Sequence, residues 1–377
     1  MPRQQLIKIR TGSTAPTAAD FQTSEPAWDG TNKKLYVKAA DGTMVQINSA
    51  GGGGGGLTKF TEAESTASPN ATVYVDSLTV AATSANADVA LVAKGLGATL
   101  AQVPDGTTIG GNKRGSNATD LQKSRTASTQ VASGISSTIS GGASNTASNN
   151  SSTVGGGSTN QASAIASTIS GGSSNGAGGS YSIIGGGRSN NANGNYSTIS
   201  GGAYNSAVGN YSTISGGAYG STRAITGYQV FPACYSPISF TLGVTQSALL
   251  LLGRQTTDAT ATVLTSDTSA ASTTNQVILP DNAAYSFSGE VIAGVTGAGN
   301  TARWTINGAI KRGANAASTT MVGTPTVTMT HNDAGAAAWT VAVTADTTNG
   351  GIAVTVTGAA ATTIRWVAKI TTTEMTF

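Results

Sequence analysis

The chain has 377 residues; more than half of them are glycine, alanine, serine or threonine, 10% are charged and 5% are aromatic. Globular proteins are usually about 25% charged, and a compact enzyme needs large side chains to fill its core, so this composition argues against an ordinary globular enzyme. The net charge of +3 is too small to indicate a nucleic-acid partner. We expect a repetitive, β-rich assembly protein.

Cysteine usage and hydropathy further limit the classes of protein to which this chain can belong. The single cysteine, Cys234, excludes an intrachain disulfide framework, and we predict that its side chain is a small buried hydrophobe. The N-terminal residues contain no apolar run of the kind found in signal peptides. The longest apolar run, residues 248–252, is far shorter than the ~18 residues of a membrane span. We therefore expect a product made in a cytoplasm without a signal peptide and without membrane insertion.

The first third of the chain predicts two small β modules joined by a linker. Residues 1–50 contain two short strands, 35–37 and 44–47, that predict a β-hairpin. Six consecutive glycines at 51–56 cannot stabilise a strand or a helix and predict a flexible linker. Residues 57–133 carry further strand signals, and we expect a β-rich transition module there.

A 15-residue unit recurs six times between residues 134 and 222. It reads Ser-Thr-Ile-Ser-Gly-Gly-x-x-Asn-x-Ala-x-Gly-Asn-Tyr. This period is too short for helical repeats or propeller blades, whose units span ~33 to 50 residues. It fits one coil of a β-roll or β-solenoid, with two short strands and glycine-containing corners. The large apolar position of the unit is held by Ile139, Val154, Ile169, Ile184, Ile199 and Ile214.

The apolar content of one coil predicts an oligomer. One Ile or Val plus one Ala contributes only about 2–4 kcal/mol on burial, whereas ordering fifteen backbones costs on the order of 15–30 kcal/mol before hydrogen bonding. A lone rod therefore lacks a sufficient core. We predict an elongated homotrimer in which the six Ile and Val residues pack on an axis shared between the chains.

The C-terminal third has a different residue pattern. Residues 223–245 form a connector, and residues 246–377 alternate large apolar residues with Thr, Ala or Arg, which predicts an antiparallel, jelly-roll-like β-sandwich. Three of the four tryptophans lie here, and we expect them in the core. The single histidine, His331, adjoins Asn332 and Asp333, and we expect it in a turn.

Residues suited to catalysis or metal binding are scarce. One histidine cannot supply a site built on two or more histidines, and no Asp or Glu occurs between Asp120 and Asp258. Glycosidases need two carboxylates, and calcium-binding β-rolls need an aspartate in each coil, so neither site is expected along the repeats. We predict no catalytic, cofactor-binding or metal-binding residues and no enzymatic activity; the carboxylates to test otherwise are Asp258, Asp267 and Glu290.

The repeat unit resembles the head repeat of trimeric autotransporter adhesins, a left-handed parallel β-roll of three chains. Residues 110–122, which lead into the repeats, resemble the corresponding stretch of bacteriophage tail fibres. Residues 7–12 and 25–29 are similar to virion-proximal ends of phage fibres, and residues 364–368 to fibre tips. The resemblance implies a homotrimeric phage tail fibre, located in the virion and docked by residues 1–50 on a tail or baseplate protein.

Several readings of this resemblance stay open. We favour a non-catalytic fibre that binds a host glycan or protein receptor through residues 246–377. A capsid- or neck-bound decoration fibre differs only in where the N-terminus docks. A bacterial surface adhesin would need an export signal, and a tailspike depolymerase would need a carboxylate-lined site in an end domain.

Receptor contact is expected in irregular loops of the tip, such as residues 294–300, 313–320 and 331–336, because loops carry specificity. No individual receptor-contacting residue is assigned. The rod is expected to position the tip; its large exposed side chains are Tyr181, Tyr196, Tyr204, Tyr211 and Tyr219.

Overall fold

The computed structural model describes residues 93, 95–235, 237–297 and 299–377, together with six strands in the first 80 residues. The chain divides into two compact units, Met1–Ala90 and Leu91–Phe377. The described residues form strands and loops, with two 3-10 helices, η2 (Ala316–Ser318) and η3 (Ala334–Ala336). The predicted all-β class is confirmed.

The first unit contains two small sheets. One has the order β1-β2-β3-β4, and the other is the antiparallel pair β5-β6. In the first sheet β3 and β4 pair antiparallel with Val37 opposite Val45, where the hairpin was predicted. The predicted linker at 51–56 lies outside the described residues. The strands are β1 (Arg10–Gly12), β2 (Pro26–Asp29), β3 (Lys34–Lys38), β4 (Met44–Gln46), β5 (Phe60–Ser65) and β6 (Val75–Val80).

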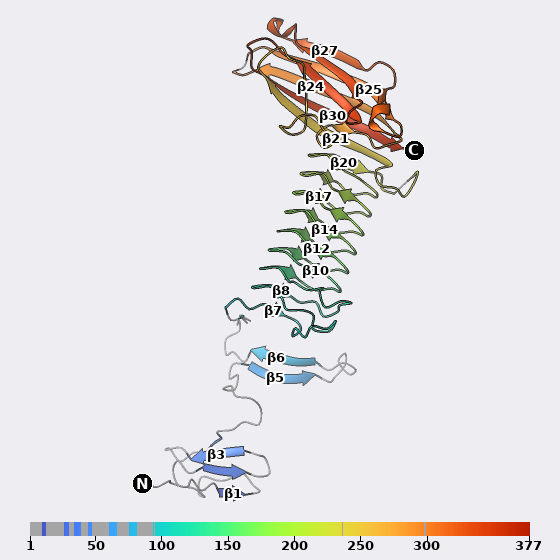
Figure 1. The fold of residues 1–377 in the computed structure, drawn as a ribbon. Coiled ribbons are helices and arrows are strands. Elements are labelled where there is room, and N and C mark those ends of the chain that lie inside the picture. The colour runs from blue at the N-terminus through green and yellow to red at the C-terminus, as the bar shows by residue number, and fades with distance from the viewer. Residues whose placement is uncertain are drawn as a thin grey trace. The chain divides into compact units, whose positions relative to one another are not determined.

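The second unit begins with a β-solenoid, as predicted, whose coils stack in register (Figure 1). Each coil contributes a two-residue strand to one parallel face and, within the repeats, another to a second face. Successive coils align one repeat apart, so that Ile169 lies beside Ile184. The first face has β7 (Thr99–Leu100), β8 (Thr119–Asp120), β9 (Thr138–Ile139), β11 (Thr153–Val154), β13 (Thr168–Ile169), β15 (Ile183–Ile184), β17 (Thr198–Ile199) and β19 (Thr213–Ile214). The second has β10 (Thr146–Ala147), β12 (Gln161–Ala162), β14 (Gly176–Ala177), β16 (Asn191–Ala192) and β18 (Ser206–Ala207).

The apolar ladder of the repeats lies inside the coil of a single chain. All six Ile and Val side chains are 0% exposed, and they belong to the same buried cluster as the alanines of the second face. A side chain that is fully covered by its own chain presents no surface to a neighbour. The predicted packing on an axis between chains is therefore wrong for Ile139, Val154, Ile169, Ile184, Ile199 and Ile214.

Buried asparagines supply the interior that the apolar residues alone could not. Asn175 donates from Nδ2 to the carbonyl oxygens of Gly171 and Gly187, each at 3.0 Å, and its Oδ1 accepts from the Asn190 backbone N–H at 3.0 Å. Equivalent bonds recur at Asn160, Asn190 and Asn205. Because a fully satisfied buried polar ladder stabilises a unique packing, one chain fills its own solenoid.

The corners of the coils direct aromatic side chains outward. Gly172 has φ +86, and a Cβ there would collide with the carbonyl of Gly187, so this corner requires glycine. The next corner holds residues other than glycine in the left-handed region, including Tyr181, Tyr196 and Tyr211 at φ 59, 57 and 55. Stacked coils therefore place these rings one above another.

A buried ion cluster closes the N-terminal end of the solenoid. Asp120 occupies the ladder position next to Ile139, and its carboxylate bonds Arg114 Nε at 2.7 Å and Arg125 Nη2 at 3.3 Å. All three side chains are buried. The solenoid thus starts upstream of residue 134, within the stretch predicted as a transition module, and a paired charge takes the place of the first isoleucine.

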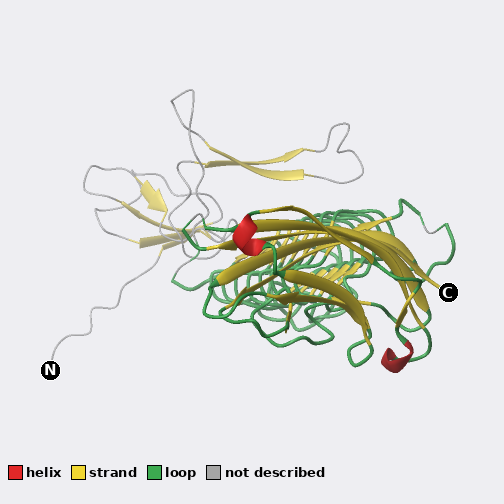
Figure 2. Ribbon diagram, turned by 90° about the horizontal axis from the view of Figure 1, so that it is seen from above, coloured by secondary structure: helices red, strands yellow, loops and turns green. Residues whose placement is uncertain are grey.

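The C-terminal region consists of two antiparallel sheets (Figure 2). The hairpins β24-β25 and β28-β29 each join consecutive strands within one sheet. Both sheets also contain crossovers, because β30 lies between β24 and β21, and β29 pairs with β22 and β23 as well as with β28. The larger sheet holds β20 (Gln229–Pro232), β21 (Thr245–Thr256), β24 (Ala283–Val295), β25 (Thr301–Arg312), β26 (Thr320–Met321), β27 (Thr326–Asn332) and β30 (Ile364–Thr376). The smaller holds β22 (Thr262–Val263), β23 (Val277–Ile278), β28 (Thr340–Asp346) and β29 (Gly351–Thr357).

Three tryptophans fill the space around the larger sheet, as predicted. Trp304, Trp339 and Trp366 are at most 3% exposed, and the Trp366 ring lies 5.6 Å from that of Trp304 and 5.9 Å from that of Trp339.

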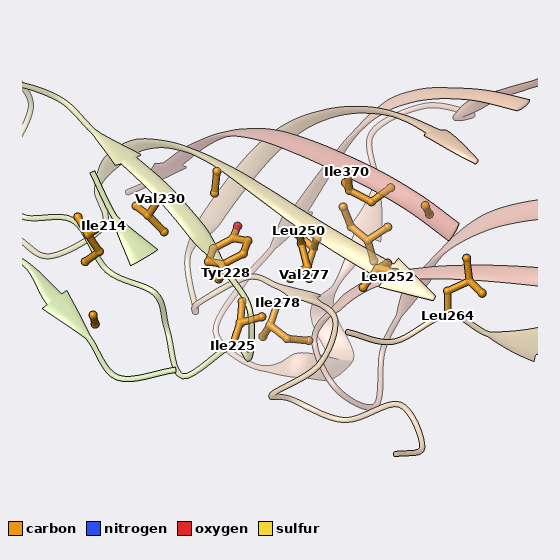
Figure 3. Close-up of a cluster of buried hydrophobic side chains, with 14 of the residues drawn as sticks. Ile214, Ile225, Tyr228, Val230, Leu250, Leu252, Leu264, Val277, Ile278 and Ile370 are labelled. Carbon is orange, nitrogen blue, oxygen red and sulfur yellow. The ribbon is translucent and has the colours of Figure 1, made fainter. Parts of the chain in front are cut away.

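Rod and tip share one sheet and one core. β20 pairs parallel with β19 of the last repeat and antiparallel with β21 of the tip, and the buried cluster runs through the joint from Ile214 to Leu250 (Figure 3). The region predicted as a connector thus contributes a strand common to both parts.

A buried polar network fastens the same joint. Glu374 accepts from Arg223 at 2.8 Å and from Gln246 at 2.7 Å, and it also accepts from the Tyr228 hydroxyl. Burial raises the pKa of Tyr228 well above its usual range, so the phenol keeps the proton that it donates. The joint is therefore held by paired charges as well as by apolar packing.

Candidate functional site

A groove of about 630 Å³ opens on the surface of the last coils of the rod, where they meet β20. The rod contributes one wall and the floor, and the loop after β20 contributes the other wall. The groove is lined by Arg188, Gly202, Ala203, Tyr204, Gly217, Ala218, Tyr219, Cys234 and Tyr235.

The repeat register explains why the groove exists. Arg188, Ala203 and Ala218 occupy the same position in successive coils and are joined by parallel bridges. Two alanines following an arginine leave the space next to its guanidinium unfilled. The groove therefore runs along the rod across neighbouring coils.

Aromatic side chains build the walls. The Tyr204 and Tyr219 rings stack at 5.0 Å, and Phe240 packs against both Tyr219, at 5.6 Å, and Tyr235, at 5.5 Å. Tyr235 is 65% exposed and Phe240 62% exposed. Exposed rings next to half-buried ones offer apolar surface together with hydroxyl groups at one site.

The Tyr219 hydroxyl keeps its proton near neutral pH, because its pKa is raised. Partial desolvation raises the pKa of Tyr219, and the neighbouring Tyr204 and Tyr235 raise it further, while Arg188 opposes the shift.

Arg188 is the cation of the site. It is the only charged residue in the sequence from 126 to 222, and its guanidinium carbon lies 5.6 Å from the centre of the Tyr204 ring. None of the ion pairs found among the described residues includes it. A guanidinium in such a cation–π contact still has N–H groups that can bind a ligand.

Cys234 is exposed and lines the groove, so the prediction of a buried thiol is wrong. The residue lies two positions after Pro232, the last residue of β20, and the chain there has already left the core. The sequence shows the cysteine but not the end of the strand.

A second hollow, of about 570 Å³, lies on the tip, where receptor loops were predicted. Arg303 lines it but is already paired with Glu290 at 2.7 Å and bonded to Thr330; this pairing lowers the pKa of Glu290. His331 is an exposed strand residue opposite Arg303 in β25, not the predicted turn residue. The cation of this hollow is thus neutralised within the protein, unlike Arg188.

The other carboxylates singled out from the sequence serve local structure. Asp258 accepts from the Thr260 N–H at 2.8 Å, and Asp267 accepts from Asn275 Nδ2 at 2.9 Å. Within the described ranges, no three His, Cys, Asp or Glu residues gather as a metal site would require. No helix in that part of the chain is long and apolar enough to cross a membrane.

The sequence analysis named Tyr204 and Tyr219 only as large side chains of a rod that positions the tip, and it did not single out Arg188, Tyr235 or Phe240. A signal for Arg188 was present, because it interrupts a position held elsewhere in the repeats by alanine or serine. Tyr235 and Phe240 lie outside the repeats, and only the path of the chain after β20 brings them to the rod.

No protein-family model and no curated protein matches the chain. Among solved structures it is similar to the tailspike protein gp49 of Acinetobacter baumannii bacteriophage Fri1, described as a capsular polysaccharide depolymerase, with 9% identity and a TM-score of 0.21 over 63% of this chain and 48% of that one. It is also similar to the tailspike of Acinetobacter phage vB_ApiP_P1, with 10% identity and a TM-score of 0.16 over 64% and 51%. The chain spans about half the length of each.

This comparison corrects one prediction. We predicted from the scarcity of His, Cys and carboxylates that the chain is not an enzyme, and the likeness to a depolymerase contradicts that prediction. The argument from composition was too broad: the missing acids of residues 121–257 bear only on the rod, whereas the tip has several.

Proposed function

We propose that this chain is a bacteriophage virion protein of the fibre or tailspike kind that attaches the virion to a glycan on the host surface. The repeats and their lead-in, which resemble phage fibres, support the class. The groove supports the ligand, and it is the observation on which the proposal rests. Sugars present apolar C–H faces framed by hydroxyls, which suit exposed rings beside hydrogen-bond donors.

In this proposal the groove is the main receptor contact, and the tip loops around Arg303 are a separate second contact. The uncompensated cation favours the groove over the tip hollow. The shared strand β20 fixes the groove, because it carries Tyr235 and Cys234 to the rod. Residues 1–50 are proposed to dock on a tail or baseplate protein, with a capsid or neck protein as the alternative.

The binding proposal is tested with the full-length protein, fluorescently labelled, on a panel of bacterial strains. Tyr235→Ala is expected to weaken binding to a recognised strain about three- to tenfold, because it removes an aromatic contact. Phe377→Ala, which alters an exposed aromatic side chain outside the groove, is expected to bind normally. Equal binding by the two variants and the wild type would contradict the groove assignment. New reducing ends in the same incubation would distinguish binding alone from binding with cleavage.

We also propose a homotrimer, with a contact that differs from the predicted one. Exposed apolar side chains follow one edge of the rod at two adjacent repeat positions, Ile135 and Ile165 at the first and Tyr181, Tyr196 and Tyr211 at the second, with Asn150 and Ser151 in the coil between the two isoleucines. A partner of the same length and period covers such an edge most completely, and another copy of the chain has both.

Sedimentation of the purified protein is expected to give three times the 37.1 kDa chain mass. Tyr196→Lys is expected to dissociate the trimer without unfolding the chain, because this side chain is 49% exposed within one chain. A wild-type protein that sediments as a folded monomer would refute the trimer.

A further inference from the structure

We infer that the glycan bound in the groove is acidic and that Arg188 binds its carboxylate. This inference rests on the proposed glycan-binding function and adds the chemical class of the ligand. Its starting point is the position of one unpaired cation in a segment that contains no acid of its own.

The charge around the groove is uncompensated. The sequence has no Asp or Glu from residue 121 to residue 257, so no residue of the repeats or of the loop after β20 offers a carboxylate to Arg188. Among the described residues, the buried or half-buried arginines bond to a carboxylate, as Arg114, Arg125 and Arg223 do, or to backbone carbonyl oxygens, as Arg254 does. Arg188 is exposed at the groove, and no ion pair among the described residues includes it.

The geometry around Arg188 matches a carboxylate. Its guanidinium carbon lies 5.6 Å from the centre of the Tyr204 ring, a cation–π contact, and a guanidinium can form two parallel hydrogen bonds with a carboxylate. Lysine would give the same charge without this fork. The alanines that follow Arg188 in the next coils leave room for the ligand beside the guanidinium.

The rest of the groove suits the remainder of a sugar. Tyr204, Tyr219 and Tyr235 supply hydroxyl donors and ring surface. A volume of about 630 Å³ lies within the range of small-ligand sites. A charged group held at one end and apolar ring surface beside it together select an acidic saccharide over a neutral one.

The single cysteine provides a direct readout of occupancy. Cys234 is exposed and lines the groove, so its reaction rate with a maleimide reports whether the groove is filled. The probe is surface polysaccharide purified from a strain that the protein binds, used native and after chemical reduction of its carboxylates to hydroxymethyl groups. Reduction removes the charge and leaves the sugar rings in place.

We expect the native polysaccharide to protect Cys234 and to bind at least about tenfold tighter than the reduced form, because a hydrogen bond to a charged group is involved. Arg188→Gln should bind both forms equally, and Arg188→Lys should recover part of the difference. Arg365→Gln, the same change at an exposed residue of β30, should behave as the wild type.

Equal binding of the native and reduced polysaccharide by the wild type would overturn the acidic ligand while leaving glycan binding intact. Retention of the full difference by Arg188→Gln would overturn the role of Arg188. Binding to cells without binding to either polysaccharide would refute the glycan itself, and with it this inference.

Discussion

Replacement of Ile184 by aspartate is expected to unfold the rod rather than to dissociate it. Ile184 is 0% exposed within one chain and lies in the ladder between Ile169 and Ile199. A carboxylate there would be buried without a cation, at a cost of about 3–5 kcal/mol. Because each coil is stabilised mainly by its neighbours, the damage should spread along the stack. Far-UV circular dichroism and the thermal midpoint measure it.

The adjacent residue provides the control. Ile183 lies on the same strand but is 45% exposed, so Ile183→Asp should leave the thermal midpoint nearly unchanged. If the ladder instead faced an axis between chains, Ile184→Asp would yield folded monomers in sedimentation. That outcome would contradict the interior described here and restore the packing predicted from the sequence.

Most of the fold of the rod could be predicted from the repeat period. A 15-residue spacing of Ile139 and its equivalents is enough to predict stacked coils, because strands in register need the same residue at the same step. The period alone could not show whether these side chains face the interior of one chain or an axis between chains. The apolar area of one coil suggested a missing partner, whereas the interior is completed by asparagine side chains such as Asn175, which bond to their own and neighbouring coils.

The tip, too, could be predicted from the sequence only in part. Alternation predicted antiparallel strands, and Trp304, Trp339 and Trp366 lie in the core as expected. The boundary between tip and rod could not be predicted from the residue pattern. Residues 229–232 look like part of an irregular connector, but they hydrogen-bond to β19 on one side and β21 on the other. Pairing between distant segments of a chain leaves no local pattern.

The candidate site was predictable only in part. Tyr204 and Tyr219 stand out in the sequence as aromatic residues of the repeat, but their partners Tyr235 and Phe240 come from outside it. The importance of Arg188 depends on what surrounds it: two alanines at the matching positions and no acid within reach. The sequence shows that Arg188 interrupts the repeat. Only the stacked coils show that the space beside its side chain is left unfilled by the alanines of the next coils.

Removal of the Asp120 carboxylate is expected to open the N-terminal end of the solenoid. Asp120→Ala would leave Arg114 and Arg125 buried without their anion, and breaking a buried ion cluster in this way costs about 3–5 kcal/mol. The loss should be local, since the cluster contacts only the first coils and solenoids open in units. Hydrogen exchange should therefore speed up in β8 and β9 more than in β17 and β19.

Two further variants test whether the effect of Asp120→Ala comes from the buried charges that it leaves unpaired. Asp258→Ala removes an exposed carboxylate whose role is to accept from Thr260, and it should leave exchange in β8 and β9 unchanged. Arg114→Met combined with Arg125→Met and Asp120→Leu removes all three charges, and it should recover stability relative to Asp120→Ala, because a well-packed apolar set replaces buried ion clusters at little or no cost. Exchange that rises equally in all coils of Asp120→Ala would show that the cluster stabilises the whole rod instead of its first coils.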